Sequence, residues 1–205
     1  MWKKGFFYSP ASSIENGDSS NTSNWELFNH SGTHIDFPFH FYKGGQTIND
    51  FPVDFWIFKK EKIQVIEIDL DGDLLIKPEQ IKNNNINFNS ELILIKTVYS
   101  KYRNEEKYWK YNPGLSMEFV EWIREKFTNL KVVGLDSISV SSWQHRDIGR
   151  KVHKKLLDPC DPILIIEDMD LSKIDKNTNF KNIVIAPLMV EGADGSPCTI
   201  LAELV

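Results

Sequence analysis

The sequence predicts an α/β protein made of one domain, in which a mixed β-sheet packs against helices. Two observations lead to this prediction. Short β-rich runs alternate along the chain with segments whose apolar residues recur at three- and four-residue steps, as in strands alternating with amphipathic helices. The chain has 205 residues, of which 41% are hydrophobic, which is enough for one well-filled core. The strands outnumber the helices, so the sheet is expected to be mixed.

The expected strands are apolar runs that end at polar or turn-forming residues. The run ELILIKTV, residues 91–98, is almost continuously apolar, as in strands that are covered on both faces. The runs expected as strands are Ile63–Ile68, Glu91–Val98, Lys131–Asp136, Ile163–Ile166 and Ile183–Ala186, with Thr199–Val205 as a candidate for the last one.

The clearest expected helix is Ser116–Phe127. Ser116 suits the N-cap position, and the apolar residues that follow it fall at helical steps along one face. A second helix is expected at Arg146–Leu157. A short helix is expected at Lys77–Ile81, with a proline near its first turn.

Residues 1–24 are rich in Ser, Asn and Gly and show no apolar period. They are expected to form either an extended N-terminal arm or irregular loops around a short strand near Phe6–Tyr8. The domain itself is expected to span residues 25–205, because no composition shift or linker divides that stretch.

Composition excludes several classes of function. The net charge is −5 and the lysines are scattered, which argues against a nucleic-acid partner. No run approaches the roughly 20 apolar residues of a transmembrane helix, so no membrane partner is expected and the location is expected to be cytoplasmic. Cys160 and Cys198 stand alone, with no metal-binding or redox spacing, and are expected to be buried free thiols.

Three of the five histidines fall within one stretch of eleven residues: His30, His34 and His40. Imidazole nitrogen and carboxylate oxygen are ligands that Zn²⁺ and other divalent transition ions prefer, and Asp36 lies among the three. A His-x-Asp pair on an extended stretch points both side chains to one face. Gly32 permits a turn that brings His30 to the same face. The alternative is a set of ordinary polar loop residues with buried histidines bonded to backbone.

The stretch His30–Phe41 is similar to the H-x-G-T-H-x-D-x-P-x-H-F signature of the cyclase family, which includes bacterial kynurenine formamidases and isatin hydrolases. Further segments resemble the family in the same order, from about Trp25 to the C-terminus. They are Tyr111–Ser116 (P-G-L-S), Val133–Ser139 (V-G-x-D-x-x-S), His153–Leu157 (H-x-x-L-L), Ile165–Glu167 (I-I-E) and Gly192–Pro197 (G-x-D-G-S-P). The family's opening D-L-S-x-P strand and Y-P-G-D loop are not recognisable in this sequence.

This resemblance implies a swivelling β/β/α-like fold and a divalent metal centre, with zinc in two-ion members and manganese in some one-ion members. Carried over by position, His30, His34 and Asp36 bind one ion. Asp36 also bridges to a second ion, whose ligands are His153 and Glu167. His40 corresponds to the proposed proton shuttle, with Glu167 as the other candidate for proton transfer. An extended chain after Asp36 would bring His40 to the same side as the metal ligands. The family also implies a homodimer or a larger homo-oligomer.

The expected activity is hydrolysis of a small amide bond, such as that of an N-formyl arylamine or a cyclic amide, with metal-activated water as the nucleophile. Two alternatives stay open. One is a biosynthetic cyclase or lactonase acting on a pathway intermediate, and the other is a metal-stabilised binding protein without turnover.

Three smaller questions also stay open in the sequence. Glu167 could form a salt bridge with Lys or Arg in place of binding a metal. His145 could face the pocket or lie on the surface ahead of its helix. The aromatic residues near the metal motif could line a pocket, although most are expected to be core: Trp25, Phe28, Phe37, Phe39, Phe41, Tyr42, Phe51, Phe55 and Trp56.

Overall fold

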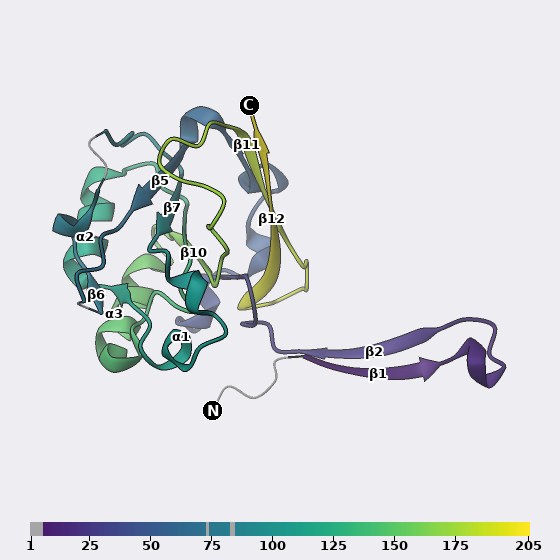
Figure 1. Ribbon diagram of the computed structural model, residues 1–205. Coiled ribbons are helices and arrows are strands. Elements are labelled where there is room, and N and C mark those ends of the chain that lie inside the picture. The colour runs from purple at the N-terminus through teal and green to yellow at the C-terminus, as the bar shows by residue number, and fades with distance from the viewer. Residues whose placement is uncertain (1–5, 73, 83–84) are drawn as a thin grey trace.

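The computed structural model describes residues 6–72, 74–82 and 85–205. Two parts are visible in Figure 1: a rounded body and a long hairpin that projects from it. The hairpin consists of β1 (Phe6–Ser12) and β2 (Thr22–Leu27), which pair antiparallel. The predicted N-terminal arm therefore takes the form of a hairpin, and its first strand is longer than the predicted Phe6–Tyr8. Residues 1–5 of the arm lie outside the described part of the chain.

An eight-stranded mixed sheet forms the centre of the body, as predicted, in the order β4-β11-β12-β3-β10-β9-β7-β5. The strands β5, β7, β9 and β10 run parallel, whereas β3, β4, β11 and β12 join by antiparallel pairing. The bounds are β3 (His34–Asp36), β4 (Ile57–Lys59), β5 (Ile63–Glu67), β7 (Leu92–Lys96), β9 (Val132–Leu135), β10 (Leu164–Glu167), β11 (Phe180–Pro187) and β12 (Gly195–Leu204). A separate two-stranded sheet pairs β6 (Leu75–Ile76) with β8 (Gly114–Leu115).

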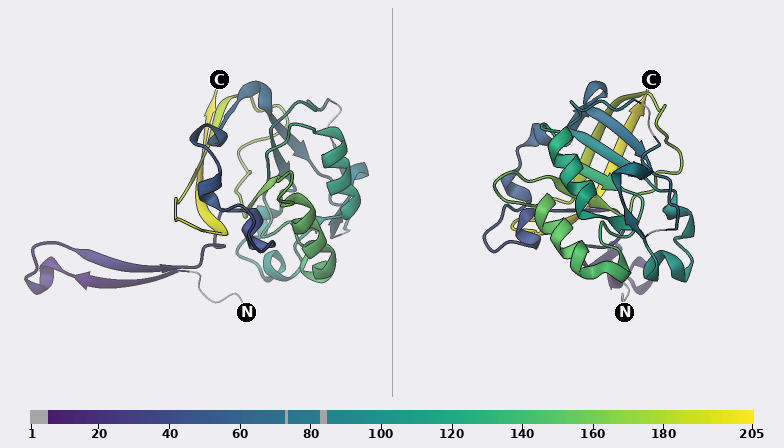
Figure 2. Two further views of the ribbon diagram at one scale, coloured as in Figure 1. Left: turned by 180° about the vertical axis from the view of Figure 1, so that it is seen from behind. Right: turned by 90° about the vertical axis from the view of Figure 1, so that its left-hand side faces the viewer.

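The helices are α1 (Glu106–Lys110), α2 (Met117–Lys126) and α3 (Arg146–Leu156). Helices α2 and α3 lie side by side against the parallel strands, and β11 and β12 lie on the opposite side of the body (Figure 2). Ser116 caps α2 as predicted, because its side chain accepts a hydrogen bond from the Phe119 N–H. None of the helices in the described ranges is long and apolar enough to cross a membrane.

The predicted strands and the two main helices are all present, with shifted ends. The last strand differs most, since β12 begins at Gly195, four residues before the predicted start at Thr199. Its first part pairs with the short strand β3, and its second part pairs with β11. The predicted short helix at Lys77–Ile81 is a single 3₁₀ turn, Pro78–Gln80.

The core lies between the sheet and the helices and extends under the loops that follow β3. Residues of the parallel strands β7, β9 and β10 are almost completely buried on both faces, which explains their nearly continuous apolar runs, whereas the edge strand β5 is buried only in part. Fully buried residues from separate elements include Ile35, Phe37, Ile66, Ile93, Phe119, Val133, Val152 and Ile165. Burial on this scale fixes the central strands, and with them the side chains that follow at their ends.

Candidate metal centre

Strand β3 holds the centre of the histidine motif in the middle of the sheet, between β10 and β12. Alternation along the strand places His34 and Asp36 on one face and the buried Ile35 on the other. Nε2 of His34 lies 3.5 Å from Oδ1 of Asp36. Gly32 has φ +66°, which turns the chain before the strand and returns His30 to the same face, as predicted.

The two remote residues of the predicted site also reach this face. Glu167 ends β10 directly opposite His34 in the antiparallel pairing, and its Oε2 lies 3.6 Å from Nε2 of His34. His153 comes from α3, and its Nε2 lies 3.2 Å from Oε1 of Glu167 and 3.8 Å from Oδ2 of Asp36. The salt bridge to Lys or Arg considered for Glu167 is absent among the described residues. Its carboxylate instead accepts hydrogen bonds from the Ser139 hydroxyl and the Val140 N–H.

The orientation of two histidines fits a bound metal ion. Nδ1 of His34 lies 2.8 Å from the Gly32 carbonyl oxygen, and Nδ1 of His153 lies 2.9 Å from the Gly149 carbonyl oxygen. With Nδ1–H donating to a backbone carbonyl, Nε2 carries the lone pair toward the carboxylates, which is the usual arrangement of metal-binding histidines.

The spacing of the donor atoms fits an ion as well. Ligands about 2.1 Å from one ion in a tetrahedron lie roughly 3.4 Å apart. The separations among His34, Asp36, Glu167 and His153 fall between 3.2 and 3.8 Å. All four residues are buried, and burying two carboxylates without a cation would be costly. Ligand atoms of His34, Asp36 and Glu167 all lie within 4.8 Å of one another, as do those of His30, Asp36 and His40, so the described residues offer two candidate groups that share Asp36. His153 places its Nε2 beside the carboxylates of Asp36 and Glu167.

His30 belongs to the second group, with Asp36 and His40. Its Nδ1 lies 2.8 Å from Oδ1 of Asp36 and its Nε2 lies 3.0 Å from Oδ2 of Asp194, so both ring nitrogens face carboxylates at hydrogen-bond distance. Gly195 packs against the ring, and a Cβ at that position would lie 2.3 Å from Cε1 of His30. Glycine is therefore required at 195 for His30 to reach Asp36.

His40 reaches the site by a route that differs from the predicted one. The chain after Asp36 does not stay extended. Instead, Pro38–His40 forms a 3₁₀ turn, because proline fixes the backbone at its first position. The side chain of His40 is 30% exposed, and its Nδ1 lies 2.9 Å from Oδ2 of Asp194.

Asp194 is the residue that sequence reasoning missed. It belongs to the segment Gly192–Pro197, which resembles the family loop, but the resemblance gave it no role. In the structure its carboxylate joins two histidines of the motif, His30 and His40, and accepts a hydrogen bond from the preceding Asn29 at 2.6 Å. Its place in this family-like segment was the sequence feature that could have indicated a role for Asp194.

The histidines and carboxylates of the site shift one another's pKa values. Burial works to lower the pKa of His30, but the hydrogen bonds and charges of Asp36 and Asp194 outweigh burial and raise that pKa to about 9. Burial works to raise the pKa of both carboxyls, but their histidine neighbours outweigh it, so that of Asp36 is lowered and that of Asp194 falls to about 2. The carboxylates are therefore ionised and offer negative charge to a cation.

A cavity of about 360 Å³ lies above these side chains. Of the nine aromatic residues near the motif, Phe28 and Phe41 line it, and Phe41 stacks on His153 with ring centroids 4.7 Å apart. Trp109 and Trp143 complete the aromatic wall. Both come from segments far from the motif in sequence, so no local pattern indicated them.

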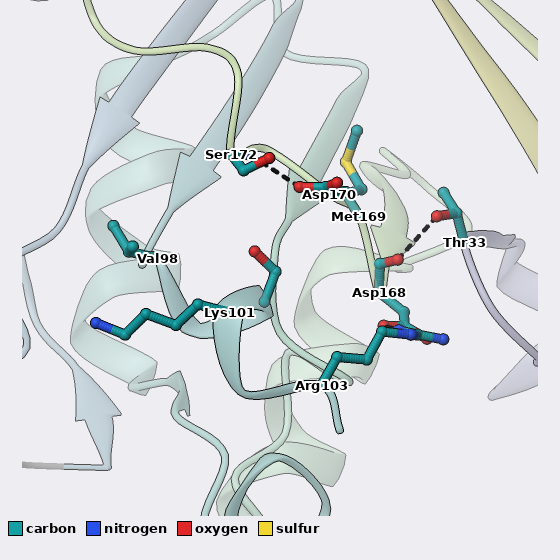
Figure 3. A pocket seen from close by; sticks show the side chains of 9 residues that line it. Thr33, Val98, Lys101, Arg103, Asp168, Met169, Asp170 and Ser172 are labelled. Carbon is teal, nitrogen blue, oxygen red and sulfur yellow. Dashed lines mark hydrogen bonds and ion pairs between the residues drawn. The ribbon is translucent and has the colours of Figure 1, made fainter. Parts of the chain in front are cut away.

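A second cavity, of about 370 Å³, is lined in part by residues next in sequence to the metal-site residues (Figure 3). It is lined by Thr33 and Asp168, the immediate neighbours of His34 and Glu167. Asp168 has φ +58°, a strained value for a residue other than glycine. Arg103 and the Tyr108 hydroxyl both bind its carboxylate, and the Thr33 hydroxyl donates to its carbonyl oxygen. These contacts fix the turn that follows Glu167.

Two further predictions have clear outcomes. His145 is exposed at the start of α3 and does not line the metal-site cavity, so it is the surface histidine of the two alternatives. The prediction of buried thiols is wrong for Cys160, which is exposed because it lies in the turn after α3. Cys198 is partly buried on β12, and burial raises the pKa of its thiol to about 12.

Comparison with known proteins identifies the family. Residues 2–142, more than two thirds of the chain, match the family described as "Putative cyclase". The chain belongs to this family. It is 28% identical to Cyclase-like protein 3 of Arabidopsis thaliana over 199 residues, which cover 94% of this chain and 69% of that protein. It is 25% identical to a kynurenine formamidase of Bacillus cereus over 192 residues, covering 94% and 84% respectively.

The fold of this cyclase-family protein is likewise shared with solved structures. Isatin hydrolase A from Labrenzia aggregata, bound to benzyl benzoate, superposes with a TM-score of 0.77 at 21% identity, covering 96% of this chain and 82% of the other. The family resemblance and the predicted fold are confirmed by these comparisons.

Proposed function

We propose that this cyclase-family protein is a metal-dependent hydrolase of a small amide bond, with an N-formyl arylamine as substrate in the manner of a kynurenine formamidase. The observation that carries the proposal is the buried set of His34, Asp36, His153 and Glu167, spaced for a divalent ion at the floor of an aromatic-walled cavity. The names of the relatives support the reaction class. Zn²⁺, as one ion or two, fits the nitrogen and carboxylate donors, and Mn²⁺ is the alternative.

A divalent ion held by these residues supplies Lewis acid chemistry, because it polarises an amide carbonyl and lowers the pKa of water to about 7. The protein's own residues supply orientation and proton transfer. Glu167 is held by the Ser139 hydroxyl and the Val140 N–H, which favours a fixed ligand over a mobile base. His40 has its Nδ1 on Asp194, so its Nε2 is the ring nitrogen left to take a proton and pass it to the departing nitrogen.

The first prediction follows from metal dependence. Purified protein is expected to hydrolyse N-formylkynurenine, and removal of metal by dipicolinate should lower the rate on the order of 10³-fold, because the ion contributes several kcal/mol to the transition state. Adding Zn²⁺ or Mn²⁺ to separate samples should restore activity and identify the more effective ion. Simple aryl esters measured in parallel test the breadth of the reaction. Full hydrolysis after metal has been removed, as measured by plasma mass spectrometry, would overturn the proposal.

We also propose that the protein forms a homo-oligomer through its hairpin. In the pairing of β1 and β2, Tyr8 lies opposite Trp25, and Phe6 lies opposite Leu27. All four side chains share one face of the ribbon and are between 38% and 71% exposed. A two-stranded ribbon is marginally stable alone in water, so this apolar face needs a partner surface. A second copy of the chain is the partner we propose.

The second prediction concerns this face. The double variant Tyr8→Ser/Trp25→Ser is expected to shift the protein from oligomer to monomer, as measured by light scattering during size-exclusion chromatography. Phe7→Ser removes an exposed aromatic from the opposite face of the ribbon and serves as the matched control, with the oligomer retained. A wild-type protein that is monomeric at all concentrations would contradict the proposal.

A further inference from the structure

Arg146 lines the metal-site cavity and has no ionic partner in the part of the chain that the structure describes. It is the first residue of α3 and its side chain is exposed. The sequence contains four arginines, all in described parts of the chain. Arg103, Arg124 and Arg150 each form an ion pair, with Asp168, Asp161 and Asp147. Arg146 lies within ion-pair distance of none of the described carboxylates.

The position of the Arg146 guanidinium is nevertheless fixed by the cavity wall. Its Cζ lies over the Trp143 ring, 3.6 Å from the centroid. Trp143 is itself held through its backbone N–H, which donates to Oδ1 of the buried Asn112 at 3.2 Å. A guanidinium stacked on an aromatic ring keeps its N–H donors for in-plane hydrogen bonds, and carboxylates accept such bonds in pairs.

Negative and positive side chains lie in different parts of the cavity lining. The floor holds the carboxylates of Asp36 and Glu167 with their histidines, whereas the mouth holds a positive charge. Arg146 is the only Lys or Arg among the described residues that line the cavity. The neighbouring acid, Asp147, is occupied by Arg150. An anion entering the cavity is therefore attracted to Arg146 first, and an aromatic ring attached to it has the tryptophan and phenylalanine walls to contact.

We infer that Arg146 determines specificity by binding a carboxylate of the substrate, so that the preferred substrates are aryl amides that also carry a carboxylate group. This inference rests on the proposed function. The amide lies at the floor, the aromatic ring lies between the walls, and the carboxylate lies at the mouth against the guanidinium.

Binding without turnover is the first arm of the test. The metal-loaded wild-type protein is expected to bind 2-aminobenzoate about 10- to 100-fold more tightly than the neutral 2-aminobenzamide, the usual worth of a charge-assisted hydrogen bond. Titration calorimetry gives both constants. In Arg146→Gln the preference should fall to near unity, and Arg146→Lys should retain part of it. Lys151→Gln removes an exposed charge from the same helix, outside the cavity lining, and should keep the wild-type preference.

Turnover is the second arm. N-formylkynurenine and its α-carboxamide, which keeps the α-amino group and lacks only the carboxylate, are compared as substrates. Arg146→Gln is expected to lower the ratio of their kcat/KM values by about 10- to 100-fold, mainly through KM, because the contact is present in ground and transition states alike. If the wild type hydrolyses neither compound, the proposed function fails while the binding arm still tests Arg146. Equal preference in wild type and Arg146→Gln, in either arm, would overturn the inference.

Discussion

Asp36→Ala is expected to leave the purified protein without bound metal and with hydrolysis reduced to background. Asp36 lies close to three histidines of the site and belongs to both candidate ligand groups. Its Oδ1 lies near His30 and His34, and its Oδ2 lies near His153. Losing it removes a ligand from each ion and leaves the histidines without their shared counter-charge. The loss of activity can approach the whole catalytic enhancement, which for enzymes is typically about 10⁶-fold or more.

The conservative variant Asp36→Asn separates loss of metal from loss of structure. The amide keeps the size of the side chain and can still hydrogen-bond to His30, but it lacks the negative charge that a divalent ion requires. Plasma mass spectrometry should find no more than a trace of metal in both variants, and circular dichroism should find the Asn variant folded. Asp147→Asn, which changes an exposed acid on α3, is the control and should retain its metal. A wild-type metal content in Asp36→Ala would exclude this residue from the centre.

The parts of the site that the sequence predicts are those encoded by local spacing. His34 and Asp36 alternate on one strand, so their common face follows from backbone geometry alone. Gly32 has the left-handed conformation that its place before the strand suggested. Glu167 was expected at the end of a buried strand because four apolar residues precede it, and β10 ends there. The remote His153 and Glu167 were placed in the site by family resemblance, and the pairing of β10 with β3 brings Glu167 opposite His34.

The parts that escaped prediction depend on contacts between distant segments. Trp109 and Trp143 meet in one cavity wall because α1 packs against the 3₁₀ turn Trp143–His145 that precedes α3, and neither segment carries a period or motif that indicates a pocket. The path of His40 was also misjudged, since Pro38 starts a 3₁₀ turn where an extended chain was expected. The short strands β3 and β4 are only three residues long, too short for an alternating pattern to be recognised.

His40 differs from the buried donors in ways that suggest chemistry over metal binding. Its side chain is partly exposed to the cavity, whereas His34 and His153 are almost completely buried. One ring nitrogen is held by Asp194, which orients the imidazole as carboxylates do in catalytic pairs. The His40 ring lies near that of His30, with centroids 4.1 Å apart, and its ligand atom groups with those of His30 and Asp36, so metal binding is the alternative that a His40 variant has to test.

His40→Ala is therefore expected to keep its metal and its fold and to lose turnover by about 10²- to 10⁴-fold, the usual worth of a positioned general acid and base. Metal analysis, thermal unfolding and kcat measured on one preparation test these three points together. His145→Ala removes the exposed histidine outside the cavity and should match wild type in all three. Loss of metal along with activity in His40→Ala would make His40 a ligand. Near-normal turnover with full metal would instead assign the proton transfer to Glu167 or to bulk water. Both ring nitrogens of His30 face carboxylates, and those of His34 face the Gly32 carbonyl oxygen and the carboxylates of Asp36 and Glu167.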